Sequence, residues 1–391
     1  MTDRKLVDLF EETFGARDGI QLYSAPGRVE LGGNHTDHQH GNVLAASINL
    51  DMRAACAVNG TNTLCVKSDG YPKIEIDLGD LSARECDKNT TTSLVRGIAD
   101  AFFRRGRDIS GADMYIVSDV LKGSGLSSSA AFEVLTATAL SGLFDAGFDA
   151  VEIAKIGQYA ETVHFGKPSG LMDQMACSVG GIVAIDFKNE MPKVQKIECN
   201  LESYGYDLAI IDAGADHADL TEEYASIPAD MHAVASCFGK KFLADVDETE
   251  FFERLSAVRK ITGDRAVLRA IHFVEDNRRA VCEAECLKRG DFDGFLKLVS
   301  ESGRSSFMYL QNVYASGETK NQAMAYALAA CEHLLEGRGA VRIQGGGFGG
   351  TVEAFVPKDM RGYFEDGIDK MIGKGMCRML AIRPDGGKRI L

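Results

Sequence analysis

The sequence predicts a mixed α and β fold in two packed domains. Short stretches rich in β-branched residues alternate along the chain with longer stretches of helical character. The length of 391 residues favours two domains over one. Apolar residues make up 45% of the chain and charged residues 26%, so a large core can form and extensive disorder is not expected.

Helices and strands are expected in the following order. The first fifteen residues, MTDRKLVDLFEETFG, predict an amphipathic acidic helix and do not have the form of a signal peptide. Short, β-branched runs predict strands at 54–58, 74–78, 113–120, 181–187, 208–212, 341–343 and 352–356. Longer segments predict helices at 93–105, 128–143, 151–163, 264–289, 292–306 and 321–336. The stretch 188–206 has the least structural character, so the predicted domains are 1–200 and 201–391.

Charge and cysteine content exclude several classes of protein. The chain has 43 Lys and Arg against 57 Asp and Glu, a net charge of −14, and shows no basic patch, so a nucleic-acid or anionic membrane partner is not expected. No apolar run approaches the roughly 18 residues of a membrane span. The ten cysteines are scattered and lack the spacing of a disulfide framework. A reduced protein of the cytoplasm is therefore predicted.

The segment KGSGLSSSA, between the expected strand at 113–120 and the expected helix at 128–143, has the form of an anion-binding loop. Glycine lets the backbone approach a phosphate closely, and the first turn of a helix presents unpaired N–H groups. For Ser127 and Ser128 taken alone, simple capping of the helix is the more common role. The segment contains neither a Walker sequence nor the third glycine of a dinucleotide fingerprint.

Five glycines surround Phe348 in the segment RIQGGGFGGT. Gly345, Gly347 and Gly350 fit the pattern G-x-G-x-x-G, but a strand is expected after them where a dinucleotide site requires a helix. So many glycines are costly in folding entropy. They favour close packing of this backbone against a neighbouring loop or ligand over a flexible hairpin tip.

A polar cluster occupies thirteen residues near the N-terminus. Its members are Arg28, Asn34, His35, Asp37, His38 and His40. A zinc site is disfavoured because the histidines lack the spacing of a helical H-x-x-x-H pair and no cysteine joins them. Carboxylate, imidazole and amide groups together suit a polyhydroxylated ligand, which requires both donors and acceptors.

The segment AETVHFGKPSGLMDQ places Glu161 at the end of an expected helix and Asp173 after a loop that contains Gly and Pro. Each acid alone is expected to be a solvated surface charge. In combination with a phosphate loop, the two would supply the metal ligand and the candidate base that phosphoryl transfer requires.

Together the four segments resemble the galactokinase branch of the GHMP small-molecule kinases. APGRVELGGNHTDH is similar to the sugar-site signature, GSGLSSSAAFEV to the phosphate loop, AETVHFGKPSGLMDQ to the metal-and-base segment and RIQGGGFGGT to the third motif of the family. The resemblance covers most of the chain. It implies an α+β protein with an N-terminal ribosomal-protein-S5-like α/β domain, a C-terminal ferredoxin-like α+β domain and an active site in the cleft between them.

The resemblance also implies an activity, namely ATP- and Mg²⁺-dependent phosphorylation of the anomeric hydroxyl of α-D-galactose to galactose 1-phosphate. Asp173 and Arg28 would be the catalytic residues. The residues implied to bind the sugar are Asn34, His35, Asp37, Gly170, Asp173 and Tyr224. Those implied to bind the nucleotide are Gly123, Ser124, Gly125, Leu126, Ser127, Ser128, Ser129 and Ala130. Ser128 and Glu161 would hold Mg²⁺.

Departures from the family pattern leave alternatives open. Asn34 replaces a Glu that binds the sugar's 6-hydroxyl in the family, and a neutral amide can serve a 6-carboxylate or a hydroxyl equally. The run Asp37-His38-Gln39 resembles that of galacturonokinase relatives, so galacturonate is the alternative substrate. A catalytically silent galactose and ATP sensor is a further alternative, disfavoured because Arg28 and Asp173 are present. The sequence does not fix the oligomeric state, for which a monomer is one option.

Overall fold

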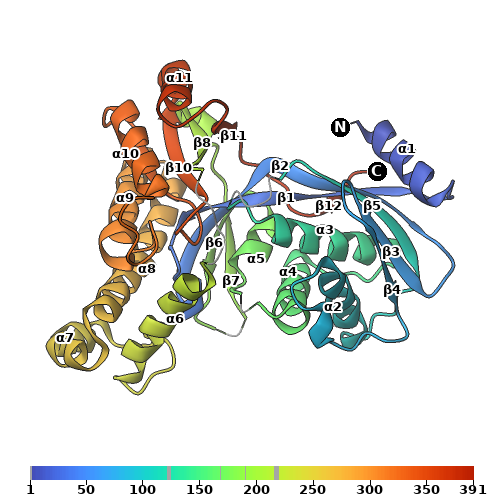
Figure 1. Cartoon of the computed structure of the whole chain (residues 1–391), viewed down its shortest axis with the longest axis horizontal. Coiled ribbons are helices and arrows are strands. Elements are labelled where there is room, and N and C mark those ends of the chain that lie inside the picture. The colour runs from blue at the N-terminus through green and yellow to red at the C-terminus, as the bar shows by residue number, and fades with distance from the viewer. Residues whose placement is uncertain (1, 121–124, 168, 190, 215–219) are drawn as a thin grey trace.

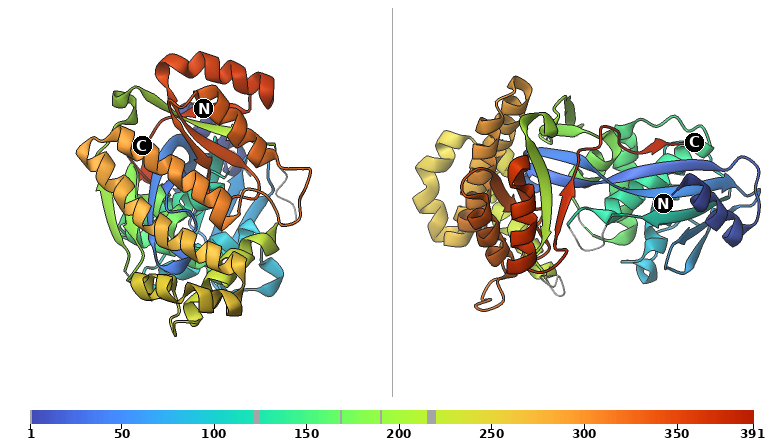
Figure 2. Two further views of the ribbon diagram at one scale, coloured as in Figure 1. Left: turned by 90° about the vertical axis from the view of Figure 1, so that its left-hand side faces the viewer. Right: turned by 90° about the horizontal axis from the view of Figure 1, so that it is seen from above.

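The computed structural model describes residues 2–120, 125–167, 169–189, 191–214 and 220–391. Two β-sheets form its framework, and helices cover their faces (Figure 1). The molecule is longer in one direction, with the first part of the chain at one end and the C-terminal helices at the other (Figure 2). The predicted mixed α+β class is confirmed.

The larger sheet has eight strands among the described residues. Their order is β12–β1–β2–β5–β3–β4, and β6 pairs with both β2 and β7. The long strand β2 bridges the sheet, because its residues 42–46 pair with β6 and its residues 52–58 pair with β5. The bounds are β1 (Gln21–Gly32), β2 (Asn42–Val58), β3 (Thr63–Ser68), β4 (Lys73–Asp77), β5 (Ala112–Ser118), β6 (Ile182–Asp186), β7 (Lys193–Ile197) and β12 (Lys388–Arg389).

Helices cover both faces of this sheet. Successive strand residues point to opposite faces, so Leu22 and Tyr115 pack against the N-terminal helix while Tyr23 and Ile116 join the main core with the other helices. Side-chain caps fix two helix starts: Thr90 accepts from the Ser93 N–H and Asp149 from the Glu152 N–H. The bounds are α1 (Asp3–Phe14), α2 (Thr91–Arg104), α3 (Ser128–Leu143), α4 (Ala150–Tyr159) and α5 (Met172–Val179).

The smaller sheet is antiparallel, in the order β11–β8–β10–β9. Ala354 faces the core beneath α10 and α11, whereas its neighbour Phe355 packs edge-on against Phe295 of α9 at a centroid distance of 5.3 Å. Phe355 belongs to the main core, so one apolar core continues from sheet to sheet. The bounds are β8 (Tyr206–Asp212), β9 (Ala340–Ile343), β10 (Thr351–Pro357), β11 (Cys377–Leu380), α9 (Phe292–Ser305), α10 (Ala323–Leu335) and α11 (Arg361–Met371).

Three further helices form a layer beside the first sheet. The long helix α8 (Asp264–Arg289) packs against α6 (Thr221–Ser236) and α7 (Glu248–Thr262) through a third apolar cluster. It also lies against β1 and β2, where Phe273 and Glu283 closely approach Gly41 and Gly32. This helix therefore packs the C-terminal helices against the first sheet.

The stretch 188–206, expected to be the least structured, is more ordered than the sequence indicated. It contains β7 and a 3₁₀ turn at Leu201–Tyr204. The strand escaped notice because it carries charged residues, as edge strands commonly do. The division into 1–200 and 201–391 stays a prediction. Residues near the C-terminus return to the first sheet, where β12 pairs with β1 and Ile382 pairs with Ile48.

Two further properties bear on the sequence-based expectations. No helix in the described part of the chain has the length and apolar character needed to cross a membrane. All ten cysteines are free thiols.

Candidate active site

Arg28 and Asp173 form a bidentate ion pair although 145 residues separate them in sequence. Arg28 Nε donates to Asp173 Oδ1 at 2.8 Å and Arg28 Nη2 donates to Oδ2 at 2.9 Å. A change of register in β1 at Pro26 and Arg28 aims the arginine, and the first turn of α5 carries the aspartate. A planar guanidinium and a carboxylate in this geometry fix each other's orientation.

The environment keeps both members of the pair charged. Burial raises the pKa of Asp173, but the guanidinium of Arg28 and the hydroxyl of Ser127 outweigh burial and lower the pKa below its ordinary value. Burial lowers the pKa of Arg28, but Asp173 more than compensates and the pKa is raised. The carboxylate is thus a ready hydrogen-bond acceptor and a weak base.

The start of α3 lies directly beside this pair. Ser127 precedes the helix with a positive φ of 56°, and its hydroxyl donates to Asp173 Oδ2 without capping α3. No side chain of the described residues caps this helix start, so its first N–H groups are open to an anion. Simple helix capping by Ser127, the alternative raised by the sequence, is therefore wrong.

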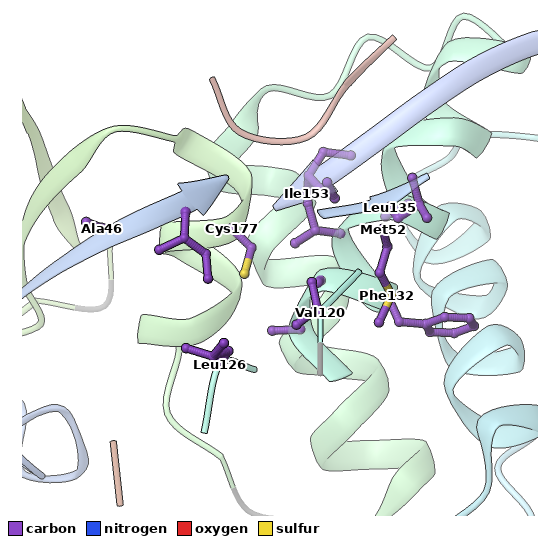
Figure 3. Close-up of a cluster of buried hydrophobic side chains, with 14 of the residues drawn as sticks. Ala46, Met52, Val120, Leu126, Phe132, Leu135, Ile153 and Cys177 are labelled. Atoms are coloured by element: carbon purple, nitrogen blue, oxygen red, sulfur yellow. The ribbon is translucent and has the colours of Figure 1, made fainter. Parts of the chain in front are cut away.

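The residues on either side of the segment 121–124 anchor the predicted phosphate loop. The segment itself, with the predicted nucleotide ligands Gly123 and Ser124, lies outside the described residues. Val120 and Leu126 are buried in the main core, where Figure 3 draws them near Cys177 and Phe132. The Leu126 carbonyl accepts from the Arg28 N–H at 3.1 Å. The Gly125 carbonyl accepts from the Arg28 side chain. These bonds fix the loop to β1.

Asp37 and Gly170, both implied to bind the sugar, lie against each other. A Cβ atom added to Gly170 would stand 1.9 Å from Asp37 Oδ2, so no other residue fits there without movement. The second carboxylate oxygen of Asp37 accepts from the His38 N–H at 2.9 Å. Asp173 lies three residues after Gly170, so this contact brings the polar N-terminal cluster to the start of α5.

His35 and Tyr224 contact the glycine-rich segment 345–350. His35 Nε2 donates to the Gly346 carbonyl at 2.9 Å, and the Tyr224 hydroxyl donates to the Gly347 carbonyl at 2.7 Å. Burial lowers the pKa of His35 to about 3, so its imidazole is neutral. The prediction that these glycines allow close packing against a neighbouring loop is confirmed, since a Cβ on Gly347 would stand 2.1 Å from the carbonyl oxygen of Asn312, which lies in the loop before α10.

Asn34 does not have the open position that a ligand contact requires. Its side chain is 0% exposed. Its Nδ2 donates to Glu30 Oε1 at 2.8 Å and to the Gly345 carbonyl at 2.7 Å. Its Oδ1 accepts from Asn312 Nδ2 at 2.8 Å and from Ser306 Oγ at 3.3 Å.

An acidic corner lies next to Asp173. Gln174 Nε2 donates to Glu161 Oε2 at 2.8 Å and to Glu133 Oε2 at 2.9 Å, and Lys167 Nζ lies 3.0 Å from Glu161 Oε1. Burial, reinforced by the charge of Glu161, raises the pKa of Glu133 well above its ordinary value. The predicted helix 151–163 ends in a π-helical turn, Ala160–Phe165, instead of continuing as a regular α-helix. Glu161 lies on this turn.

The donor set of this corner suits Mg²⁺, which prefers oxygen ligands and retains several water or phosphate ligands. Glu161 offers a buried carboxylate. Ser128 is the first residue of α3, and Ser129 lies one turn before Glu133, on the same face of the helix. Within the described ranges, no group of three or more His, Cys, Asp or Glu side chains is arranged to hold a metal ion.

Three residues of this neighbourhood were not predicted from the sequence: Glu133, Lys167 and Gln174. Gln174 follows Asp173 directly, and Lys167 lies in the predicted Gly and Pro loop, so their proximity to the site could have been inferred. Glu133 lies within an apolar helix. An acid at such a position is a signal of a buried polar function.

Residues 93–181, which include the start of α3, Glu161 and Asp173, match the family model of the GHMP kinases N terminal domain. The structure of Lactococcus lactis galactokinase complexed with galactose superposes with a TM-score of 0.84 at 24% identity, covering 98% of this chain and 99% of that chain. Methanococcus jannaschii mevalonate kinase gives a TM-score of 0.66 at 16% identity, covering 94% and 99%. The fold and the site define a small-molecule kinase of the GHMP class.

Sequence comparison shows which family of this class the chain resembles. Residues 8–58 match the galactokinase galactose-binding signature. The galactokinase of Glaesserella parasuis serovar 5 is 31% identical over 90% of this chain and 88% of its own length. That of Actinobacillus pleuropneumoniae serotype 5b is 30% identical over 93% of each. The chain belongs to the galactokinase family.

Proposed function

We propose that this chain transfers the γ-phosphoryl group of ATP to the anomeric hydroxyl of α-D-galactose, with galactose 1-phosphate and ADP as products. Membership of the galactokinase family supports the reaction. The structural observation that carries it is the Asp173 carboxylate, which Arg28 orients and which contacts Ser127 at the open start of α3. An acceptor hydroxyl on Asp173 would thus lie close to a phosphate on the helix.

The residues of the chain have distinct tasks in this reaction. Asp173 accepts the hydrogen bond of the anomeric hydroxyl and orients its oxygen toward the γ-phosphorus. The new O–P bond forms as the bond from phosphorus to the bridging oxygen of ADP breaks, and the hydroxyl proton passes to Asp173. Because the pKa of Asp173 is low, this transfer belongs late in the reaction, when the sugar oxygen has become acidic. Arg28 and the helix start stabilise the negative charge.

Magnesium would be held by Glu161 and by a hydroxyl at the start of α3, for which Ser128 is our proposal and Ser129 the neighbouring alternative. A bound Mg²⁺ supplies charge neutralisation on the phosphate oxygens. Hydrogen bonds from Gln174 and Lys167 fix the orientation of the Glu161 carboxylate. The sugar would lie among Asp37, Gly170, His35 and Tyr224.

No structural observation favours galacturonate. That alternative rested on the run Asp37-His38-Gln39 and on an Asn34 amide free to meet the C6 substituent, and this amide is bonded within the protein. The intact Arg28–Asp173 pair favours an enzyme over a silent sensor. The free thiols support our placement of the protein in the cytoplasm.

The test is an ADP-release assay with ATP and galactose, galacturonate, N-acetylgalactosamine, glucose and arabinose, each with and without EDTA. We expect turnover with galactose above the other sugars and its loss in EDTA. Heat of galactose binding without ADP release would instead identify a sensor. Preferential turnover of galacturonate would overturn the substrate assignment.

A further inference from the structure

Asn34 is the residue where this chain departs from its family's sugar signature. Every hydrogen-bonding position of its side chain has a partner within the protein. An Asn side chain has two N–H donors and one oxygen that accepts two bonds. All four positions are filled, by Glu30, Gly345, Asn312 and Ser306. A sugar substituent would have to displace one of these buried bonds, and leaving a buried polar group unsatisfied is unfavourable.

The backbone of Asn34 is fixed as firmly as its side chain. Its N–H donates to Asp276 Oδ2 at 2.8 Å, and its carbonyl lies 3.0 Å from His272 Nε2. Both partners are fully buried residues of α8. Asn34 therefore connects the end of β1 with α8, with the segment around 306–312 and with the glycine-rich segment.

The bonds of Asn34 continue into the expected wall of the sugar site. Asn312 Nδ2 donates to Asn34 Oδ1 and also, at 3.1 Å, to the Gly346 carbonyl. That same carbonyl accepts from His35 Nε2. Asn34 and Asn312 thus hold the glycine-rich segment in the place where His35 rests against it.

Glu30 fixes the other side of Asn34. Its Oε1 accepts from Asn34 and from Arg342 Nη2, the latter at 2.6 Å, and both charged side chains are buried. The Asn34 amide is therefore matched to a carboxylate neighbour. Burial raises the pKa of Glu30 to about 7, so above that pH a second carboxylate at position 34 would face an ionised Glu30 without a donor between them.

We propose that Asn34 is a positioning residue, which holds the glycine-rich wall of the sugar site through Glu30 and Asn312 and does not itself contact the substituent at C6. This inference rests on the proposed galactose kinase activity. It assigns sugar recognition at this end of the site to residues other than Asn34.

The test is a double-mutant cycle between positions 30 and 34. Asn34→Asp should raise the KM for galactose at least about tenfold, because two donated bonds are replaced by repulsion from Glu30 and Gly345. The Kd for ADP should stay within about twofold. In Glu30→Gln/Asn34→Asp the new amide can donate to the new carboxylate, so we expect KM to recover by about threefold or more.

Two further variants separate positioning from simple loss of stability. Asn312→Ala keeps both hydrogen bonds that Asn34 donates but removes the bond from Asn312 to the glycine-rich segment. This variant should also raise the KM for galactose. Asn59→Asp is the matched control, because Asn59 Nδ2 likewise donates to a carboxylate and a carbonyl, of Asp113 and Thr63, away from the site. It should lower Tm and leave KM unchanged.

A double variant no better than Asn34→Asp alone would overturn the proposal. So would a galactose complex with an Asn34 side-chain atom within hydrogen-bond distance of O6. The cycle is also measured in Tm, which does not depend on any sugar. An inactive wild-type enzyme with a strong coupling in Tm would refute the proposed function and still support the link between Glu30 and Asn34.

Discussion

At the scale of single residues, the Arg28–Asp173 pair determines what the carboxylate can do. Arg28 lowers the pKa of Asp173, so the acid is ionised at any working pH and the pH dependence of activity near neutrality must come from other groups. A lowered pKa also weakens the acid as a base. The orienting role of Asp173 therefore precedes its role as proton acceptor.

Asp173→Asn is expected to lower kcat by about 10²–10⁴-fold, because an amide of the same shape cannot take the hydroxyl proton. The Kd for ADP should change little. Steady-state kinetics and ADP titration measure the two quantities. Asp113→Asn is a suitable control, since Asp113 is a buried partner of another arginine, Arg17, on a distant part of the first sheet. A kcat near that of the wild type in Asp173→Asn would exclude the proposed role.

Whether a site residue can be predicted from the sequence depends on whether its role is visible in a local motif or arises from partners far away in the chain. Arg28 and Asp173 were identified because each lies in a short segment that resembles a family motif. The saturation of Asn34 could not be foreseen, since Asn312 and Gly345 lie 278 and 311 residues away. No local sequence pattern reveals hydrogen bonds between residues so far apart in the chain.

At the scale of elements, two long helices were predicted accurately, whereas α6 and α7 were not predicted. The ranges 128–143 and 264–289 agree with α3 and α8 to the residue. The strand β1 was missed because it is buried along almost its whole length and contains Pro26 and Gly27, so apolar and polar residues do not alternate. The helix α5 was missed because eight residues are too few for a periodic pattern.

The contact between Gly170, just before α5, and Asp37 of the polar N-terminal cluster leads to a prediction about sugar binding. Gly170→Ala should displace the Asp37 carboxylate and raise the KM for galactose by about tenfold or more, with a smaller change in kcat. Gly362→Ala, at a helical glycine with no atom within 4 Å of the added Cβ, is the matched control and should leave KM unchanged. If both variants keep the wild-type KM, Asp37 and Gly170 do not form part of the sugar site.

At the scale of the whole molecule, a buried charge network joins the two sheets. Arg342 of β9 pairs with Glu30 of β1, and Glu353 of β10 and Glu283 of α8 act on the same guanidinium. Glu353 is fully buried, and neither of its carboxylate oxygens has a hydrogen-bond partner among the described residues. Arg342 therefore interacts with acids of both sheets and of α8, and Glu30 has the direct contact.

This charge network makes the stability of the fold depend on pH. Burial, opposed by Arg342 and reinforced by Glu30, raises the pKa of Glu353 to about 8. The unfolded chain releases this proton near pH 4.3, so between about pH 4.3 and 8 the folded state binds more protons than the unfolded state. Stability from this group is thus present at low pH and declines as pH rises, by up to about 1.4 kcal/mol per pH unit.

Glu353→Gln is expected to remove that decline, because the amide resembles the protonated acid and never ionises. The difference in Tm between variant and wild type should therefore increase from pH 5 to pH 8 and then level off. Thermal unfolding at pH 5, 6, 7, 8 and 9 measures it. Glu332→Gln removes the same charge from the exposed face of α10 and should show no such trend. A difference in Tm that stays constant across this range would mean that Glu353 is ionised in the folded protein, with Arg342 shared between two carboxylates.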